Sequence, residues 1–141
     1  YSGNRLTDAI GGGVCQGSST LYNCVLLADL EVVTRSCHGA TVAYLPLGLD
    51  AAVNWGTTDF QFRNNFHFPV KIEAETTEDL VKMRILGTDE KDYYIEMTSG
   101  YDDSREDVIY AVSYKNKYSK ETGELISKDR EAFSTYYRNV G

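Results

Sequence analysis

The sequence predicts an α+β fold: one amphipathic helix near the N-terminus, followed by a mainly antiparallel β-sheet with hairpins. Two observations carry this prediction. Apolar residues recur at helical spacing in residues 18–30, and from residue 32 onward the apolar period changes to two. At 141 residues, with 42% hydrophobic and 25% charged residues, the chain also has the size and balance of a globular domain.

The expected helix has about three turns, from about Ser18 to Leu30. Its apolar positions are Leu21, Tyr22, Val25, Leu26 and Leu30. Ser18, Ser19 and Thr20 are candidate N-caps, because the Gly11-Gly12-Gly13 run is not expected inside a stable helix. Cys15 is therefore expected at, or just before, the helix N-terminus.

Short strands are expected after the helix, at residues 32–33, 41–45, 51–55 and 60–62. Residues 70–75 and 81–85 alternate apolar with charged side chains across a Thr-Thr-Glu-Asp turn, which predicts a β-hairpin with one solvated face. Further strands are expected at 93–97, at 108–114 and in part of 125–137, the last two joined through residues 120–123.

The two halves of the chain differ in composition. Residues 1–70 hold 3 basic and 5 acidic side chains and most of the glycines, whereas residues 71–141 hold 11 basic and 16 acidic ones. Eight of the 11 tyrosines follow residue 90, a pattern more typical of half-buried sheet surface than of a ligand platform. We expect a glycine-rich region at 1–70 and a charged, tyrosine-rich hairpin region at 71–141, forming one continuous domain.

The charge balance limits the partners of this chain. Its formal net charge is −7, and no basic face of the kind that binds nucleic acid or anionic lipid is visible. No apolar run is long enough for a transmembrane segment. No cofactor is expected, and a zinc site from Cys15, Cys37 and His38 would lack a fourth ligand and any paired CxxC spacing.

Cys15 is the first candidate for chemistry. A thiolate at a helix N-terminus is stabilised by unpaired amides and the helix dipole, which makes it a nucleophile near neutral pH. His38, which follows an expected strand at 31–34, is the candidate proton carrier. Asp50 or Asp59 would orient His38, with Asp59 favoured by its place at the start of a strand, and the glycines and Gln16 would supply oxyanion donors.

The alternative interpretation needs no catalysis. Cys15 is then a small side chain packed where the glycine turn meets the core, and His38 is a turn histidine that satisfies backbone groups. The cysteine count of three leaves at least one thiol without an intrachain bridge. If both Cys15 and Cys24 lay within one helix, nine residues would separate them by about 13 Å, beyond disulfide reach, whereas a Cys24–Cys37 bridge stays open.

Residues 11–23 read GGGVCQGSSTLYN, and this segment closely resembles the signature of the VanW-like family, named from vancomycin B-type resistance clusters. Gly17 stands where family members commonly carry a larger residue. The similarity continues through Arg35, His38, Val42, Tyr44, Pro46, Gly48, Asp50, Ala51, Val53, Gly56, Asp59, Phe62, Asn64, Asn65 and Pro69, and residues 107–137 resemble the strand-rich tail of many members.

The resemblance implies a bacterial, mostly Gram-positive, envelope-associated protein that acts on the extracellular or cell-envelope side, in a family often found with peptidoglycan-binding modules. It implies no particular reaction. The residues to which it gives weight are Cys15, Gln16, Ser18, Ser19, Tyr22, His38, Asp50 and Asp59.

Two hypotheses follow from the residues and the resemblance together. The first is a non-catalytic module that binds peptidoglycan peptide or an envelope protein in a groove beside the glycine turn, with candidate binding residues Gly12, Gly13, Gln16, Ser18, Ser19 and Tyr22. The second is a Cys-His enzyme, a thiol-dependent amide hydrolase or acyl transferase that acts on cell-wall peptides through Cys15 and His38.

Overall fold

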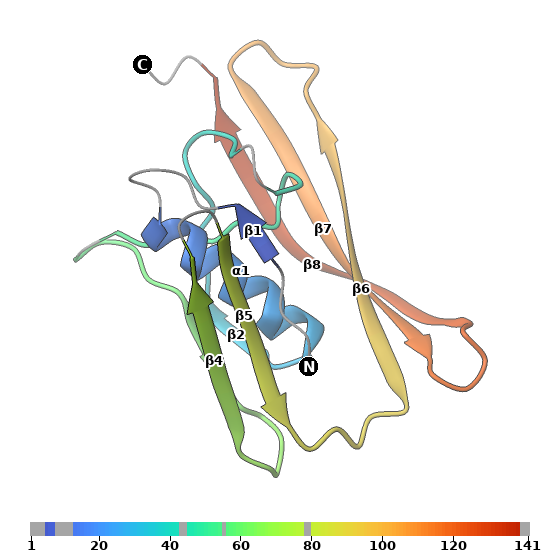
Figure 1. The fold of residues 1–141 in the computed structure, drawn as a ribbon. Helices are drawn as coiled ribbons and strands as arrows, with labels where there is room; N and C mark the ends of the chain where they lie inside the picture. The colour runs from blue at the N-terminus through green and yellow to red at the C-terminus, as the bar shows by residue number, and fades with distance from the viewer. Residues whose placement is uncertain (1–4, 8–12, 43–44, 55, 78–79, 139–141) are drawn as a thin grey trace.

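A computed structural model describes residues 5–7, 13–42, 45–54, 56–77 and 80–138 of the chain (Figure 1). The elements in chain order are β1 (Arg5–Thr7), α1 (Gly13–Leu27), β2 (Glu31–Thr34), β3 (Gln61–Arg63), β4 (Val70–Thr76), β5 (Leu80–Gly87), β6 (Tyr93–Asp102), β7 (Val108–Ser119) and β8 (Leu125–Tyr137). A helix followed by mostly antiparallel strands confirms the predicted α+β class.

The strands form three antiparallel sheets within the described ranges, where the sequence predicted one. Their orders are β1-β5-β4, β2-β3 and β6-β7-β8. Both predicted hairpins are confirmed: β4 pairs with β5 from Val70↔Gly87 to Thr76↔Val81, and β7 pairs with β8. In the second hairpin Gly123 has φ of +76°, and its N–H donates to the carbonyl of Ser119 at 2.8 Å.

Helix α1 begins at Gly13, five residues before the predicted start, so the prediction that Ser18, Ser19 or Thr20 caps it is wrong. The hydroxyls of Ser18 and Ser19 both donate to the carbonyl of Ala51, and the Thr20 hydroxyl donates to the carbonyl of Gln16. These hydroxyls therefore bind backbone groups from within the helix, and the glycine run supplies its first residue.

Helix α1 ends at Leu27, three residues before the predicted end. Asp29 has φ of +59°, and the N–H of Leu30 reaches back to the carbonyl of Val25 at 3.0 Å. This pairing and the bond from Asp29 N–H to the Leu26 carbonyl form a Schellman-type C-cap. The left-handed residue at Asp29 is what turns the chain away from the helix.

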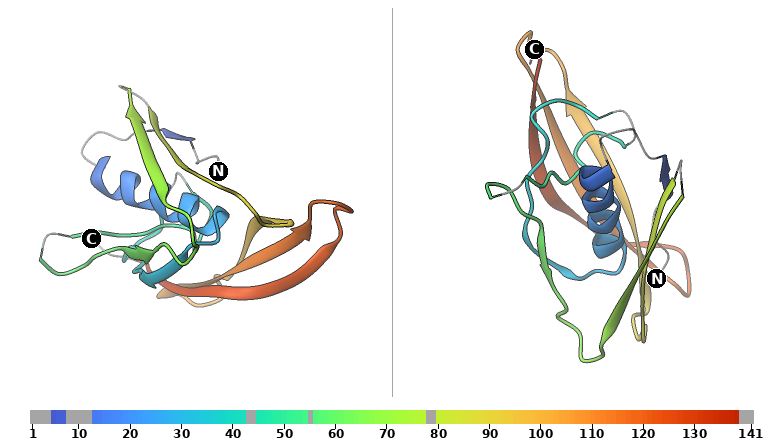
Figure 2. Two further views of the ribbon diagram at one scale, coloured as in Figure 1. Left: turned by 90° about the horizontal axis from the view of Figure 1, so that it is seen from below. Right: turned by 60° about the vertical axis from the view of Figure 1, so that its left-hand side comes forward.

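The core surrounds α1. One buried cluster joins Cys24, Val25, Ala28 and Leu30 to Ile85 of β5, and a second joins Tyr22 and Leu26 to Leu49 and Ala51. Both views in Figure 2 show α1 between the β4–β5 hairpin and the β6–β8 sheet. Because Leu49 and Ala51 belong to the second cluster, their packing against α1 holds the loop that carries them beside the helix.

The strand predicted at 51–55 is wrong, and the centre of the one predicted at 41–45, residues 43–44, lies outside the described residues. The described residues of these segments form no strand, only an isolated bridge between Asn54 and Thr58. The backbone near Ala51 is instead satisfied by helix side chains, and Ala52 N–H donates to the Ser36 carbonyl at 2.8 Å. Across the described ranges, no helix has both the length and the apolar character that crossing a bilayer requires.

Candidate functional site

Side chains of α1 hold the loop that carries Asp50. Ser18 Oγ and Ser19 Oγ donate to the Ala51 carbonyl at 2.6 and 3.2 Å, and the Ala51 N–H donates to Ser19 Oγ at 3.0 Å. The Asn23 amide donates to the Leu49 carbonyl at 2.8 Å. The backbone on both sides of Asp50 is thereby fixed to one face of the helix.

The Asp50 side chain is fully buried, and its carboxylate is surrounded by donors. Its Oδ2 accepts the backbone N–H of His38 at 2.8 Å and contacts His38 Nδ1 at 2.5 Å. Its Oδ1 accepts the Tyr136 hydroxyl and lies 3.5 Å from Arg35 Nη2. A buried carboxylate needs this many partners, because desolvation otherwise disfavours its charged form.

Burial alone raises the pKa of the Asp50 carboxyl. The hydrogen bonds donated by Tyr136 and His38 and the charge of Arg35 outweigh burial, so the pKa of this carboxyl lies below its ordinary value. Asp50 is therefore an anion at neutral pH. The same contact works in the opposite direction on Tyr136, where burial and the Asp50 charge raise the pKa of the phenol.

The Arg35 guanidinium ties Asp50 to the β6–β8 sheet. Its Nε donates to the Asp50 carbonyl at 2.8 Å, its Nη1 to Ser134 Oγ at 2.8 Å, and its Nη2 to the Gly48 carbonyl at 3.1 Å. The guanidinium also lies 5.1 Å from the ring centre of Tyr22 on α1. With only 6% of its side chain exposed, Arg35 acts as an internal brace.

Gly48 lets the loop approach the sheet closely. Its φ is +93°, a conformation that disfavours other residues, and its N–H donates to the Tyr136 hydroxyl at 2.8 Å. A Cβ at this position would lie 3.6 Å from the Cβ of Ala111 on β7. The Tyr136 phenol thus accepts a hydrogen bond from the loop and donates one to Asp50.

His38 lies in a surface pocket of about 420 Å³, called here the His38 pocket. It is lined by residues 35–39 and by Phe133, Thr135 and Tyr137 of β8. Residues 37–39 run beside β8, since Cys37 Sγ donates to the Thr135 carbonyl at 3.5 Å and Tyr137 N–H donates to the Gly39 carbonyl at 2.6 Å. The pocket therefore lies where the segment after β2 meets the last strand.

The Asp50 contact sets the chemistry of the His38 ring. With Nδ1–H donating to the carboxylate, the second ring nitrogen, Nε2, accepts a hydrogen bond when His38 is neutral and donates one when it is charged. Among the described residues, none hydrogen-bonds to Nε2. The side chain is 19% exposed, so the ring is held at Nδ1 while part of it is accessible to solvent.

The model of the family described as VanW like protein matches residues 1–86 of this chain. That match covers more than half of the 141 residues. The chain belongs to the VanW-like family. The match ends at residue 86, before β6, so it does not include residues 107–137, which were also expected to resemble the family.

One relative of this VanW-like chain is the "Uncharacterized protein YoaR" of Bacillus subtilis (strain 168). The two are 47% identical over 71 residues, which is 50% of this chain and 23% of YoaR. The chain therefore spans less than a quarter of its curated relative. No solved structure matches the chain.

Most described signature residues of the VanW-like family face the interior. Gln16, Ser19 and Tyr22 are buried, and the Tyr22 ring packs edge-on against Phe60 with ring centres 5.5 Å apart. Ser18 and Ser19 bind Ala51 as described above. In this structure these predicted binding residues support the Asp50 loop and the core.

The two carboxylates predicted beside His38 are placed differently. Asp50 contacts His38, whereas Asp59, the one favoured from the sequence, is exposed and accepts hydrogen bonds from the Phe60 N–H and the Gln61 amide, each at 2.9 Å. Asp59 precedes β3 as expected, but its position at a strand start did not indicate which residue it contacts.

The structure describes only some of the candidate residues around the start of α1. Gly12 lies outside the described residues, as does the side chain of Cys15, while the backbone of Gly13 and of Cys15 lies in the first turn of α1.

No bridge joins Cys24 to Cys37: Cys24 Sγ contacts the Met83 carbonyl, and Cys37 Sγ contacts that of Thr135.

Sequence reasoning did not name Arg35, Ser134 or Tyr136 as site residues. Arg35 was among the positions that resemble the family, so a signal for it existed. Tyr136 is 86 residues from Asp50 and lies outside the family match. Only the pairing of β7 with β8 and the packing of the Gly48 loop bring its hydroxyl to the carboxylate.

Proposed function

We propose that this VanW-like chain is a binding module on the envelope side of a bacterium, and that the His38 pocket takes the peptide part of peptidoglycan. The observation that carries the proposal is the His38 ring: a fully buried carboxylate contacts the Nδ1 atom of an imidazole that lines a pocket. Membership of the VanW-like family supports the envelope setting.

The lining of the His38 pocket suits a short peptide. Its volume of about 420 Å³ lies within the usual range for small-ligand sites. Phe133 and Tyr137 each expose more than half of their side chains there, while His38 offers a polar group. Aromatic faces beside a fixed donor or acceptor match the alternation of apolar side chains and amides along a peptide.

The test is titration of the chain with a defined muropeptide stem peptide, followed by calorimetry and by NMR of the His38 ring. We expect Gly39→Leu to weaken binding at least tenfold, because a Cβ at Gly39 meets nothing within 4 Å and a larger side chain would fill the pocket. His38→Gln should also weaken binding. His67→Gln, at the other and exposed histidine, is the matched control. Equal affinity of the native chain and the three variants for the peptide would exclude the His38 pocket as its binding site.

A second candidate is favoured by the same His38–Asp50 contact. A carboxylate on Nδ1 is the arrangement that orients a histidine general base, and the Cys15 backbone lies at the start of a helix. In this alternative the Cys15 thiolate attacks an amide carbon, and His38 gives a proton to the leaving amine. Water or an amine then attacks the thioester, gives its proton to His38 and releases Cys15.

The pH profile of iodoacetamide labelling separates the two candidates. An activated Cys15 would be alkylated well below the ordinary thiol pKa of about 8.5, and mass spectrometry would find an acyl adduct of Cys15 with muropeptides. The labelling of Cys37 in the same samples serves as the internal reference. If Cys15 is alkylated only near pH 8.5 and forms no adduct, the binding module is the function that remains.

A further inference from the structure

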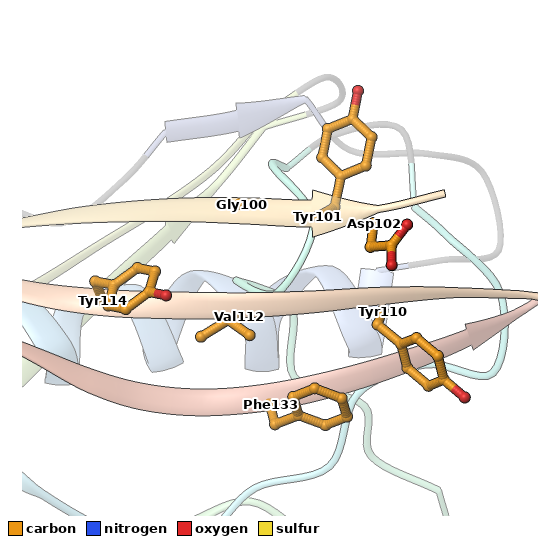
Figure 3. A pocket seen from close by; sticks show the side chains of 7 residues that line it. All are labelled: Gly100, Tyr101, Asp102, Tyr110, Val112, Tyr114 and Phe133. Atoms are coloured by element: carbon orange, nitrogen blue, oxygen red, sulfur yellow. The ribbon is translucent and has the colours of Figure 1, made fainter. Parts of the chain in front are cut away.

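The outer face of the β6–β8 sheet carries a groove, called here the tyrosine groove. It is lined by residues 100–102 of β6, by Tyr110, Val112 and Tyr114 of β7, and by Phe133 of β8, and has a volume of about 360 Å³ (Figure 3). Ala111 and Ser113 are buried on the opposite face, toward α1, so the alternating residues of β7 point outward. Of these residues, only Phe133 also lines the His38 pocket.

The strand register explains the shape of the tyrosine groove. Gly100, Val112 and Phe133 are aligned across the three strands, because Gly100 pairs with Val112 and Val112 with Phe133. The row has no side chain at Gly100, where an added Cβ would meet nothing within 4 Å. Tyr110 and Tyr114 lie on either side of Val112 along β7, as Figure 3 shows.

Tyr110 and Tyr114 mark the length of the groove along β7. They are four positions apart in the strand, which places their Cα atoms about 13 Å apart. One pyranose ring fits within this length. The Phe133 ring lies against Tyr110, with ring centres 5.6 Å apart.

The polar groups around the groove indicate a ligand without net charge. Arg105 and Lys128 lie over the rings of Tyr110 and Tyr114, at 5.8 and 4.7 Å from the ring centres. Asp102 closes one end, and four of residues 102–107 are acidic. Opposite charges this close together select neither an anion nor a cation, but they offer hydrogen bonds to hydroxyl and amide groups.

The tyrosine groove and the His38 pocket share one lining residue, Phe133, which is 59% exposed. The two sites are therefore neighbours on the surface. This shared residue distinguishes the groove from an isolated aromatic patch.

We propose that the tyrosine groove binds a neutral glycan built from pyranose rings, with one ring between Tyr110 and Tyr114. Sugar rings present C–H faces that pack on aromatic rings, and hydroxyls that bond to phenols and to the Asp102 carboxylate. The proposal rests on the proposed function in one respect: peptidoglycan peptides are attached to a glycan strand, so the two sites would hold adjoining parts of one polymer.

The experiment titrates the full chain with the tetramer of N-acetylglucosamine, a neutral glycan that carries no peptide, and follows amide NMR shifts and calorimetry. We expect shifts at Gly100, Val112 and Phe133. Tyr114→Ala removes one wall and Gly100→Val fills the floor, and each should weaken binding about tenfold. Tyr94→Ala is the matched control, since Tyr94 is exposed on the same sheet but stacks on Tyr118 outside the groove.

The glycan proposal would be overturned by no binding of the tetramer by the native chain, by equal weakening in Tyr94→Ala, or by binding of a cationic peptide in place of the tetramer. A concentration-dependent dimer that Gly100→Val abolishes would overturn it too, by assigning the groove to a second copy. Binding of the tetramer should survive Gly39→Leu in the His38 pocket. Loss of peptide binding alone would therefore leave this inference standing.

Discussion

The Nδ1 atom of His38 lies 2.5 Å from a carboxylate oxygen of Asp50, a side chain with no exposed surface. The contact joins a partly exposed imidazole to a charge held in the interior by Tyr136 and Arg35. The orientation of His38 is therefore set from beneath the surface, by Asp50 and Tyr136, which do not line the His38 pocket, and by Arg35, which does. Four measurements test this arrangement and the packing that supports it.

Asp50→Asn should destabilise the chain by about 2 to 4 kcal/mol, because it removes a charge from a buried group of paired partners and leaves Arg35 without its anion. Urea unfolding followed by circular dichroism measures the difference. Asp59→Asn provides the comparison: Asp59 is exposed, and we expect a change within about 0.5 kcal/mol. Equal effects of the two substitutions would mean that the buried charge contributes nothing.

The stability of the chain should also depend on pH through Asp50. Its carboxyl pKa is lower in the folded chain than in the unfolded one, so the unfolded chain binds more protons as the pH falls below about 4. The stabilisation is complete above that pH and is lost as the pH falls through the folded-state pKa.

The measurement is the urea midpoint at several pH values between about 2 and 6. We expect Asp50→Asn to flatten this dependence. The slope that remains would come partly from Asp29, whose carboxyl pKa is lowered by Lys115 and Tyr93 despite burial, which raises it. Parallel curves for the native chain and Asp50→Asn would show that Asp50 does not titrate differently on folding.

Tyr136→Phe should cost about 1 to 3 kcal/mol, because the ring still fills its site while Asp50 loses a donor and the Gly48 N–H loses its acceptor. We also expect broader NMR signals from the His38 ring, since one of the supports of Asp50 is gone. Tyr137→Phe, at a neighbouring tyrosine that is 57% exposed, should leave both the stability and the ring signals unchanged. A change as large in Tyr137→Phe would refute the specific role of the Tyr136 hydroxyl.

Asp29→Asn tests how the end of α1 is attached to the β6–β8 sheet. Asp29 Oδ1 lies 2.8 Å from Lys115 Nζ, and asparagine tolerates the positive φ at this position, so the substitution removes the charge and one of the two acceptor oxygens without straining the backbone. We expect a loss of about 1 to 2 kcal/mol from this partly buried pair.

The control for that measurement is Asp89→Asn. Asp89 pairs with Lys91 and Lys120 at a more exposed position, so its loss should cost less than about 1 kcal/mol. If Asp89→Asn proved the more harmful of the two, burial of the Asp29 pair would not be what stabilises the helix end.

Regular periodicity was enough to predict the hairpins from the sequence. Apolar and charged side chains alternate in β4 and β5, and β8 occupies the whole of the segment 125–137, of which only a part was predicted as strand. The start of α1 was missed because helix propensity disfavours glycine, while the packing of Val25 and Leu26 stabilises the helix as a whole.

The site could be predicted only in part. His38 and Asp50 belong to a recognisable signature, and both were named from it. Which carboxylate contacts His38 depends on hydrogen bonds between Ser18 or Ser19 and Ala51, contacts 32 or 33 residues apart that no local pattern encodes. Tyr136 was missed because its hydrogen bond to Asp50 joins residues that are 86 positions apart, which no local pattern encodes either.

The Tyr136 hydroxyl joins the part of the chain that matches the family model to the part that does not. Asp50 lies inside the family match, and β8 lies beyond it. A fragment ending at residue 86 would leave the Asp50 carboxylate and the Gly48 amide without that phenol. The pocket and the last strand should therefore open together as one cooperative unit. In hydrogen exchange, the amides of Gly48 and His38 should then show the same opening free energy as those in the centre of β8.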